Sequence, residues 1–219
     1  MTPAHSPSAS RRGLTLIEVM IAVSILSLMI VSITRAGDSA SRLFKTSVSR
    51  VTLEQRLRQS IGKIRGELEL SSSDLLDSLG DLPLWTTTAS FDRIDGIDER
   101  SGEGNWRTMR FELRMDDGET DDGTDEDGDG VVDERMLMLI LDFGTAEAME
   151  LVLVHGVREN FPGEEVNGVD DNENGLIDES GFVLYARDEA VHVLLALEGV
   201  DSEGRTIVRS VTTATRVRN

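Results

Sequence analysis

Two acidic segments that lie 45 residues apart repeat one pattern of oxygen-bearing side chains. The first reads DGTDEDGDGVVDE over residues 122–134, and the second reads NGVDDNENGLIDE over residues 167–179. Both place Asp or Asn at loop positions 1, 3 and 5, glycine at position 6, an apolar pair at 7 and 8, and Asp at 9, which is the spacing of calcium loops. The candidate ligands are Asp125, Asp127, Asp129, Asp133 and Glu134, then Asp170, Asn172, Asn174, Asp178 and Glu179, with the backbone carbonyls of Val131 and Leu176.

The pattern predicts two structural calcium sites. Alternate residues of a tight loop direct their oxygens at a common centre, where a hard cation takes six to eight oxygen ligands. Neither segment has an acid at position 12, where Met136 and Gly181 stand, so Glu134 and Glu179 or nearby acids such as Glu119 and Asp121 must complete the shell. Truncated loops of this kind, typical of extracellular modules, bind calcium with dissociation constants of about 10⁻⁴–10⁻³ M. At millimolar calcium each site contributes about 1–2 kcal/mol to folding.

The charge of the chain is concentrated in these segments. Of 41 acids, 18 lie in residues 116–134 and 164–179, which contain no Lys or Arg, and the formal net charge is −19. This composition argues against nucleic acid as a partner. The alternative interpretation, a solvated acidic loop, does not explain a repeated glycine and apolar pair. Because the chain has no Cys, calcium is the candidate for stabilising an exported head.

Nothing in the sequence indicates an enzyme. Only three histidines occur, and His155 and His192 both stand in apolar, strand-like runs, where we expect them to be sheet residues and not ligands. No G-x-S-x-G turn and no nucleotide-binding glycine loop is present. We therefore expect a structural function and not catalysis.

The N-terminus contains a run of membrane-spanning length. Residues Leu14–Ile33 form a stretch of twenty residues in which Glu18 is the one ionisable side chain. As a helix this run measures about 30 Å, the hydrocarbon thickness of a bilayer. Arg11 and Arg12 precede it, so the positive-inside rule places residues 1–13 in the cytoplasm and the remainder outside. A carboxylate inside a span is costly, and Glu18 is either an interfacial acid or a functional one.

The string RRGLTLIEVMIAV around Gly13 resembles the signal of type IV pilins and type II secretion pseudopilins. The resemblance implies that a prepilin peptidase cleaves after Gly13 and methylates the new amino group of Leu14. It also implies that Glu18 neutralises the N-terminal amine of a neighbouring subunit in the fibre. The first mature residue departs from the family, which usually has Phe there.

Downstream periodicities indicate a helix followed by strands. Residues 38–80 carry an apolar stripe at spacings of three and four, formed by Phe44, Val48, Val51, Leu57, Ile61, Ile64 and Leu68. Joined to the span, they predict one helix of up to about 65 residues. The predicted strands are Leu84–Ile94, Trp106–Met115, Arg135–Phe143, Met149–Val157, Phe182–Arg187, Val191–Leu197 and Thr206–Val217. The last two form a hairpin that, with Arg218–Asn219, resembles the C-terminal end of minor pilins and pseudopilins of the W and J types.

These features predict an α+β fold of pilin-like architecture: a long N-terminal helix, first transmembrane and then amphipathic, packed on an antiparallel sheet. The expected parts are a cleaved leader (1–13), a transmembrane or fibre-core helix (14–37), an amphipathic helix (38–80) and a β-rich head (81–219) with calcium-type loops at 119–134 and 164–179. We expect a minor pilin or pseudopilin of the bacterial inner membrane, later part of a periplasmic or extracellular fibre. Its partners would be other pilin subunits, the peptidase and the membrane. The alternative is a membrane-anchored, calcium-dependent adhesion protein that never polymerises.

Overall fold

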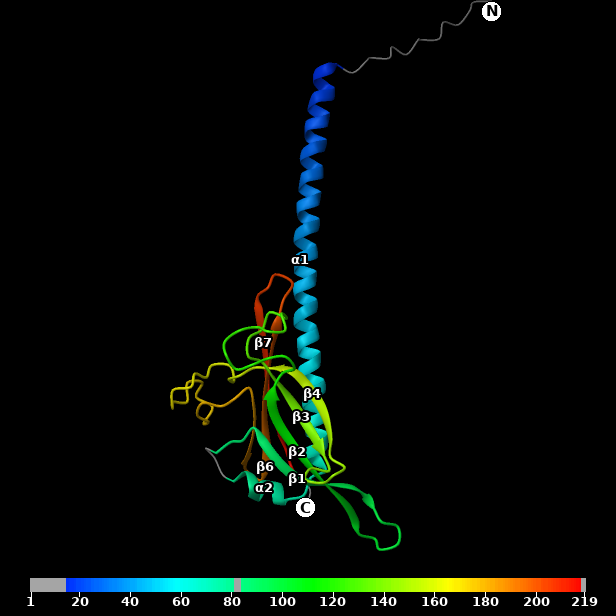
Figure 1. Cartoon of the computed structure of the whole chain (residues 1–219). Helices are drawn as coiled ribbons and strands as arrows, with labels where there is room; N and C mark the ends of the chain where they lie inside the picture. Colours follow the sequence, from blue (N-terminus) through cyan, green and yellow to red (C-terminus); the bar gives the residue numbers. More distant parts are fainter. Residues whose placement is uncertain (1–14, 81–83, 218–219) are drawn as a thin grey trace, which may run out of the picture. The chain divides into compact units, whose positions relative to one another are not determined.

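The computed structural model describes residues 15–80 and 84–217. Within these ranges it contains two helices, α1 (Leu16–Glu69) and α2 (Asp74–Leu79), and seven strands. The strands are β1 (Thr88–Ile97), β2 (Gly104–Met115), β3 (Arg135–Leu141), β4 (Met149–Val157), β5 (Phe182–Arg187), β6 (Ala190–Val200) and β7 (Thr206–Thr215) (Figure 1). The α+β prediction is confirmed. The predicted leader, Gly13 and Leu14 lie outside the described residues.

The chain divides into two compact units, residues 1–44 and 45–219. The described part of the first unit is the N-terminal portion of α1, whose apolar side chains from Leu16 to Ile33 are exposed. By length and composition, α1 is the one helix of the described residues that could cross a membrane, with a mean hydropathy of 2.6 over its most apolar 18-residue window. The second unit contains the rest of α1, α2 and all seven strands, and we call it the head.

Helix α1 ends earlier than the predicted boundary near residue 80. After Glu69 the backbone leaves the helix because β1 pairs with it: Ile94 N donates to Leu70 O at 3.1 Å, and Ser72 N donates to Asp92 O at 2.8 Å. Ser71 also forms an isolated bridge with Arg93, and its hydroxyl donates to Leu68 O. Serine side chains compete for backbone hydrogen bonds and disfavour helix interiors. The single predicted helix is therefore a long helix followed by the short α2.

The buried face of α1 starts later than the predicted stripe. Its buried residues are Leu53, Leu57, Ser60, Ile64 and Leu68, with Ile61 packed beside them. Phe44, Val48 and Val51 are exposed, which corrects the prediction that the stripe begins at Phe44. Val51 and Leu57 are six residues apart, which is not a helical spacing of three or four, so Phe44, Val48 and Val51 lie on another face of α1 than the buried residues.

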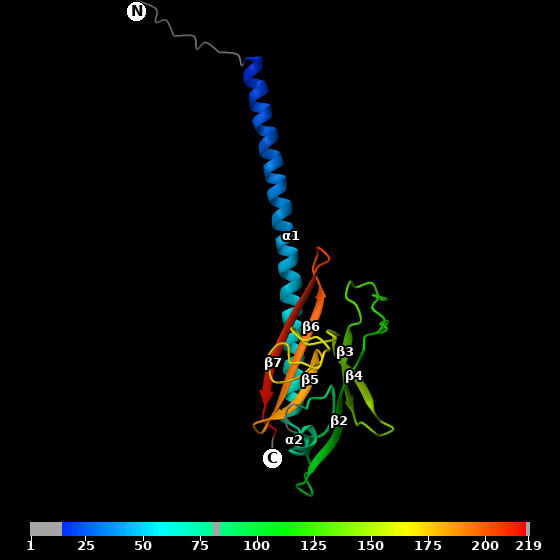
Figure 2. The same cartoon turned by 90° about the vertical axis from the view of Figure 1, so that its left-hand side faces the viewer.

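The strands form one antiparallel sheet that is held in two groups. The order is β1-β2-β3-β4-β6-β5, with β7 on the other side of β6. Strands β4 and β6 are paired only at Val157 and Leu197, whereas β6 pairs with β7 from Val191 to Val200. Figure 2 shows β5, β6 and β7 together and separated from β2, β3 and β4. The core lies where α1 meets both groups, around Phe111, Phe182 and Leu195.

The predicted strands are confirmed with small boundary changes. Strands β4 and β5 have the predicted bounds, and β6 and β7 form the predicted C-terminal hairpin. Its turn is held by Asp201, whose carboxylate accepts hydrogen bonds from the backbone of Glu203 and Arg205. Strand β1 begins at Thr88 and not at Leu84.

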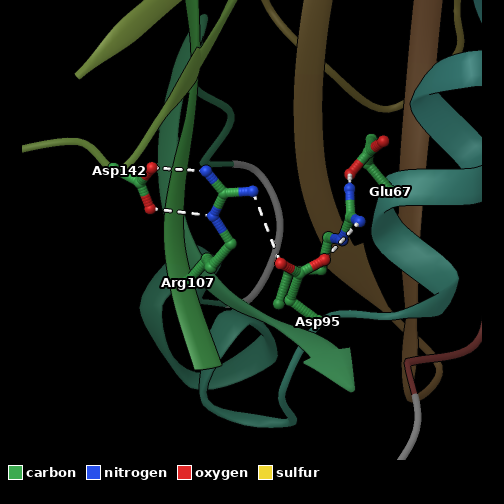
Figure 3. A network of polar contacts seen from close by, with 5 residues as sticks. Glu67, Asp95, Arg107 and Asp142 are labelled. Atoms are coloured by element: carbon green, nitrogen blue, oxygen red, sulfur yellow. Dashed lines mark hydrogen bonds and ion pairs between the residues drawn. The ribbon is translucent and has the colours of Figure 1, made fainter. Parts of the chain in front are cut away.

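A chain of ion pairs links α1 to the first sheet group. Arg93 on β1 bonds to Glu67 of α1 at 2.6 Å and to Asp95 at 3.3 Å. Arg107 on β2 bonds to Asp95 at 3.4 Å and to Asp142, which follows β3 (Figure 3). These contacts fix the β1–β3 edge against the last turn of α1.

Candidate metal sites

Two long loops of the head each connect one strand to the next in the sequence. We call residues 116–134, between β2 and β3, loop 1, and residues 161–179, between β4 and β5, loop 2. Each is closed by the same backbone bond, from Asp116 N to Glu134 O at 3.1 Å and from Phe161 N to Glu179 O at 2.9 Å. The repeat seen in the sequence is therefore also a repeat in how the two loops are closed.

The two loops share one backbone conformation. Positive φ angles recur in pairs 45 residues apart: 97° and 96° at Gly118 and Gly163, 82° and 80° at Gly123 and Gly168, 93° and 92° at Gly130 and Gly175, and 52° and 53° at Asp133 and Asp178. Gly130 and Gly175 occupy loop position 6, where the chain turns sharply and glycine avoids the cost of a Cβ in this region.

The acid at position 1 organises each turn. The two carboxylate oxygens of Asp125 accept hydrogen bonds from Gly128 N at 2.7 Å and Gly130 N at 2.9 Å. Asp170 accepts from Asn174 N at 3.1 Å and Gly175 N at 2.8 Å. These bonds hold the backbone of each turn around the carboxylate at position 1.

Positions 3 and 5 follow the same logic. In loop 1, Asp127 accepts from the amide of Asp129, which in turn accepts from the amide of Val131, each at 2.9 Å. In loop 2, Asn172 and Asn174 make the corresponding bonds at 3.0 Å and 2.8 Å. The four side chains are therefore held by their own backbone in matching geometry.

A further acid joins each loop from six residues before position 1. Glu119 accepts from the amides of Glu126 and Asp127 at 3.1 Å. Its counterpart Glu164 accepts from Asn172 N at 2.9 Å and from Asp178 N at 3.1 Å. Both are buried. Glu119 was among the sequence candidates, whereas Glu164 was missed, although it lies at the same 45-residue offset.

The carboxylates of loop 1 converge on common centres. Oxygens of Glu119, Asp125 and Asp127 lie within 4.8 Å of one another, and so do oxygens of Asp127, Asp129 and Glu134. Oε2 of Glu119 and Oε2 of Glu134 are buried without a hydrogen-bond partner. Burial, together with the nearby charges of Asp129, Glu119 and Asp127, raises the pKa of Glu134 to about 7. Buried, unpaired carboxylates are costly unless a cation neutralises them.

Loop 2 has the same backbone conformation but fewer carboxylates, because positions 3 and 5 are Asn172 and Asn174. Glu179 is fully buried, and its Oε2 has no partner. Its Oε1 accepts a hydrogen bond from Asn172 Nδ2 at 2.8 Å and another from Asn174 Nδ2. The side chain of Leu176 is buried with Val183 and Tyr185, which anchors the loop to the sheet.

Asp133 and Asp178, at position 9, have a different role in this geometry. Asp133 accepts from the amides of Asp122 and Gly123 at 2.9–3.1 Å. Asp178 accepts from Asn167 and Gly168 at 2.9–3.0 Å. Both carboxylates bind backbone amides near the start of their loops. Among the described residues, neither belongs to a group of carboxylates whose oxygens face one another. Their predicted role as ligands remains a prediction.

Glu18 forms a reciprocal cap at the start of α1. Thr15 N and Thr15 Oγ1 donate to Glu18 Oε2 at 2.8 Å and 2.9 Å, and Glu18 N donates to Thr15 Oγ1 at 3.3 Å. This is a capping box, which satisfies backbone donors that have no partner within the helix. The same carboxylate that the resemblance assigns to assembly therefore also stabilises the first turn of its own helix.

The two histidines of the head have sheet-surface partners. His155 Nδ1 lies 2.6 Å from Oδ1 of Asp116, and His192 stacks on Tyr185 at 4.8 Å between ring centroids. Both residues lie on strands, as predicted.

Comparison with known proteins identifies the N-terminal segment. Residues 8–34 match the prokaryotic N-terminal methylation motif. The predicted resemblance to a type IV pilin-like prepilin is confirmed by this match and by the apolar helix that begins at Leu16. No curated protein and no solved structure matches the chain.

Proposed function

We propose that this protein is a minor pilin or pseudopilin, a structural subunit of a type IV pilus or a type II secretion pseudopilus. The observation that carries the proposal is the methylation motif at residues 8–34, which overlaps the apolar start of α1. A helix of this kind can be held in a membrane and later packed among identical helices. The head then supplies contacts to other subunits, and the protein has a mechanical and not a catalytic role.

In this proposal the leader 1–13 is cytoplasmic, and the peptidase cleaves after Gly13 and methylates Leu14. The head lies outside the cytoplasm, first at the inner membrane and then on a periplasmic or extracellular fibre. Glu18 exchanges its hydrogen bonds to Thr15 for the charged amine of a neighbouring subunit, so that the carboxylate is paired within the fibre. Such pairing sets the register between subunits.

The proposal includes two structural calcium ions, one in each loop. It is supported by converging carboxylates in loop 1 and by buried oxygens without partners on Glu119, Glu134 and Glu179. Asp125, Asp127, Asp129 and Glu134 would hold the first ion with Glu119, and Asp170, Asn172, Asn174 and Glu179 would hold the second with Glu164. Calcium suits these oxygens because it accepts many carboxylate and carbonyl ligands in flexible geometry.

Processing and assembly can be tested separately in the natural host. Gly13→Ala should leave the leader attached. The variant recovered from cells should then be heavier than the processed wild type by about the mass of residues 1–13, and it should lack methylation. Equal masses would exclude cleavage at this site.

Glu18→Ala tests polymerisation against the alternative of a simple anchored adhesion protein. A fibre subunit should be processed and membrane-bound but absent from sheared fibres, whereas an anchor would keep its surface function. Glu54→Ala is the matched control, since Glu54 is an acid of α1 that pairs with Arg58 and has a side chain 46% exposed. Fibre incorporation of Glu18→Ala at the level of this control would contradict the assembly role.

A further inference from the structure

The two loops differ in chemistry at the centre of the same backbone frame. Positions 3 and 5 carry Asp127 and Asp129 in loop 1 but Asn172 and Asn174 in loop 2. A carboxylate can only accept hydrogen bonds, whereas an amide carries both an acceptor oxygen and two N–H donors. The buried glutamate at position 10 therefore meets different neighbours in the two loops.

In loop 2 the amides engage one oxygen of the buried glutamate, Oε1, from within the protein, while Oε2 has no partner. Asn172 Nδ2 and Asn174 Nδ2 both donate to Oε1 of Glu179. Their side-chain oxygens remain engaged by backbone amides of the turn. The amide groups thus provide partial positive charge at the place where a cation would otherwise be required.

In loop 1 the equivalent side chains cannot do this. Oxygens of Asp127 and Asp129 lie within 4.8 Å of those of Glu134, and none of the three groups can donate when ionised. Oε2 of Glu134 has no partner, and Oε2 of Glu119 is in the same condition. Like charges at this separation repel, and burial reduces screening by solvent.

We propose that loop 1 requires its cation to stay closed, whereas loop 2 keeps its closed form without one. This inference rests on the proposed calcium function and assigns the two sites unequal roles. Loop 1, whose five carboxylates form two facing groups that share Asp127, binds calcium more tightly because affinity rises with ligand charge. It is also the loop that opens when calcium is removed.

Loop 1 is placed where its opening would change the surface of the head. Asp127, Asp129 and Glu134 line a cavity of about 570 Å³ together with residues of α1, namely Ser49, Thr52 and Arg56. The loop packs on the β6–β7 hairpin so closely that a Cβ on Gly130 would come within 2.9 Å of Val200. Calcium in loop 1 therefore determines whether these three acidic side chains line the cavity beside α1.

Hydrogen exchange of the full-length chain in detergent at pH 7.5 tests the inference. Peptides covering residues 122–131 and 167–176 report the amides of Gly130 and Gly175, which bond to Asp125 and Asp170 at 2.9 Å and 2.8 Å. In chelator, we expect the first peptide to exchange freely and the second to stay protected. Calcium at 100 times its dissociation constant should slow exchange of the first peptide by about 100-fold.

Reciprocal variants show whether protection depends on the side chains at positions 3 and 5 or on the place of each loop in the fold. Asp127→Asn with Asp129→Asn should protect loop 1 in chelator. Asn172→Asp with Asn174→Asp should make loop 2 exchange freely until calcium is added. Circular dichroism of each double variant checks that the head remains folded.

The outcomes distinguish this inference from the proposed calcium function. If calcium slows exchange in both loops equally and both are free in chelator, calcium binding stands and the inequality is wrong. If protection does not follow the amides in the reciprocal variants, the inequality is also wrong. If terbium luminescence and exchange show no cation binding in either loop, the calcium function fails and the inequality fails with it.

Discussion

Arg107 donates two parallel hydrogen bonds to the carboxylate of Asp142, from Nε to Oδ1 at 2.9 Å and from Nη2 to Oδ2 (Figure 3). Arg107 lies on β2, and Asp142 directly follows β3 with a positive φ of 54°. The planar guanidinium matches the carboxylate geometry, which makes such pairs stronger than single contacts. The pair therefore fixes the end of β3 beside β2.

This pair should make the stability of the head depend on acid. The hydrogen bonds from Arg107 lower the pKa of Asp142 in the folded state. The folded state then binds fewer protons than the unfolded state, so the contribution is present above the unfolded pKa and is lost as the pH falls through the folded pKa. Asp142→Asn should lower the free energy of unfolding at pH 7, and its difference from wild type should shrink on acidification.

Urea unfolding of the full-length chain in detergent with chelator, between pH 7 and pH 3, measures this difference. Asn tolerates the positive φ of residue 142, so the variant changes charge with little backbone strain. Asp188→Asn is the control, because Asp188 has a similar φ of 53° but a side chain that is 89% exposed. A constant difference between Asp142→Asn and wild type across this pH range would contradict the assignment.

Gly181 should be intolerant of any side chain. A Cβ at this position would lie 1.9 Å from the backbone oxygen of Arg158. Arg158 directly follows β4, and Gly181 directly precedes β5. Gly181→Ala must displace backbone, and we expect a loss of about 3 kcal/mol or more, the upper end for overpacking. Gly66→Ala in α1 is the matched control, since nothing lies within 4 Å of its Cβ, and it should stabilise the helix by about 1 kcal/mol. Thermal unfolding that ranks the two variants otherwise would overturn this expectation.

Asp133 and Asp129 should differ in their effect on calcium binding. Asp133 holds the amides of Asp122 and Gly123, and Asp129 faces Asp127 and Glu134. Asp129→Asn removes charge at the ion and should weaken binding to loop 1 more than Asp133→Asn, which keeps an acceptor oxygen for the amides. Calorimetric titration compares the two. An equal or larger loss for Asp133→Asn would show that position 9 also contacts the ion.

Removing calcium should lower the melting temperature of the head. Two sites at millimolar calcium contribute about 1–2 kcal/mol each. At roughly 2–4 °C per kcal/mol for a chain of this size, the shift should be several degrees. Differential scanning calorimetry of the full-length chain with calcium, with chelator and with magnesium measures it. An unchanged melting temperature in chelator would exclude structural calcium.

The sequence by itself determined the features that depend on local spacing. Short runs with period two or with continuous apolar content placed β4 and β5 at their observed bounds, and the glycine and acid spacing located both loops, because these signals arise from neighbouring residues. The methylation motif at residues 8–34 is likewise a contiguous string and depends on no tertiary contact.

Only the tertiary structure decided what depends on distant contacts. Helix α1 stops at Glu69 because the backbone of β1 bonds to Leu70 and Ser72, and no local pattern contains that pairing. Which apolar side chains of α1 enter the core was also decided there, since Leu53 and Leu57 are buried and Phe44 is exposed. The two loops have almost the same spacing, and their difference appeared only when folding buried Glu134 beside carboxylates and Glu179 beside amides. Burial converts a small change of composition into a large change of electrostatic free energy, because solvent no longer screens the charges.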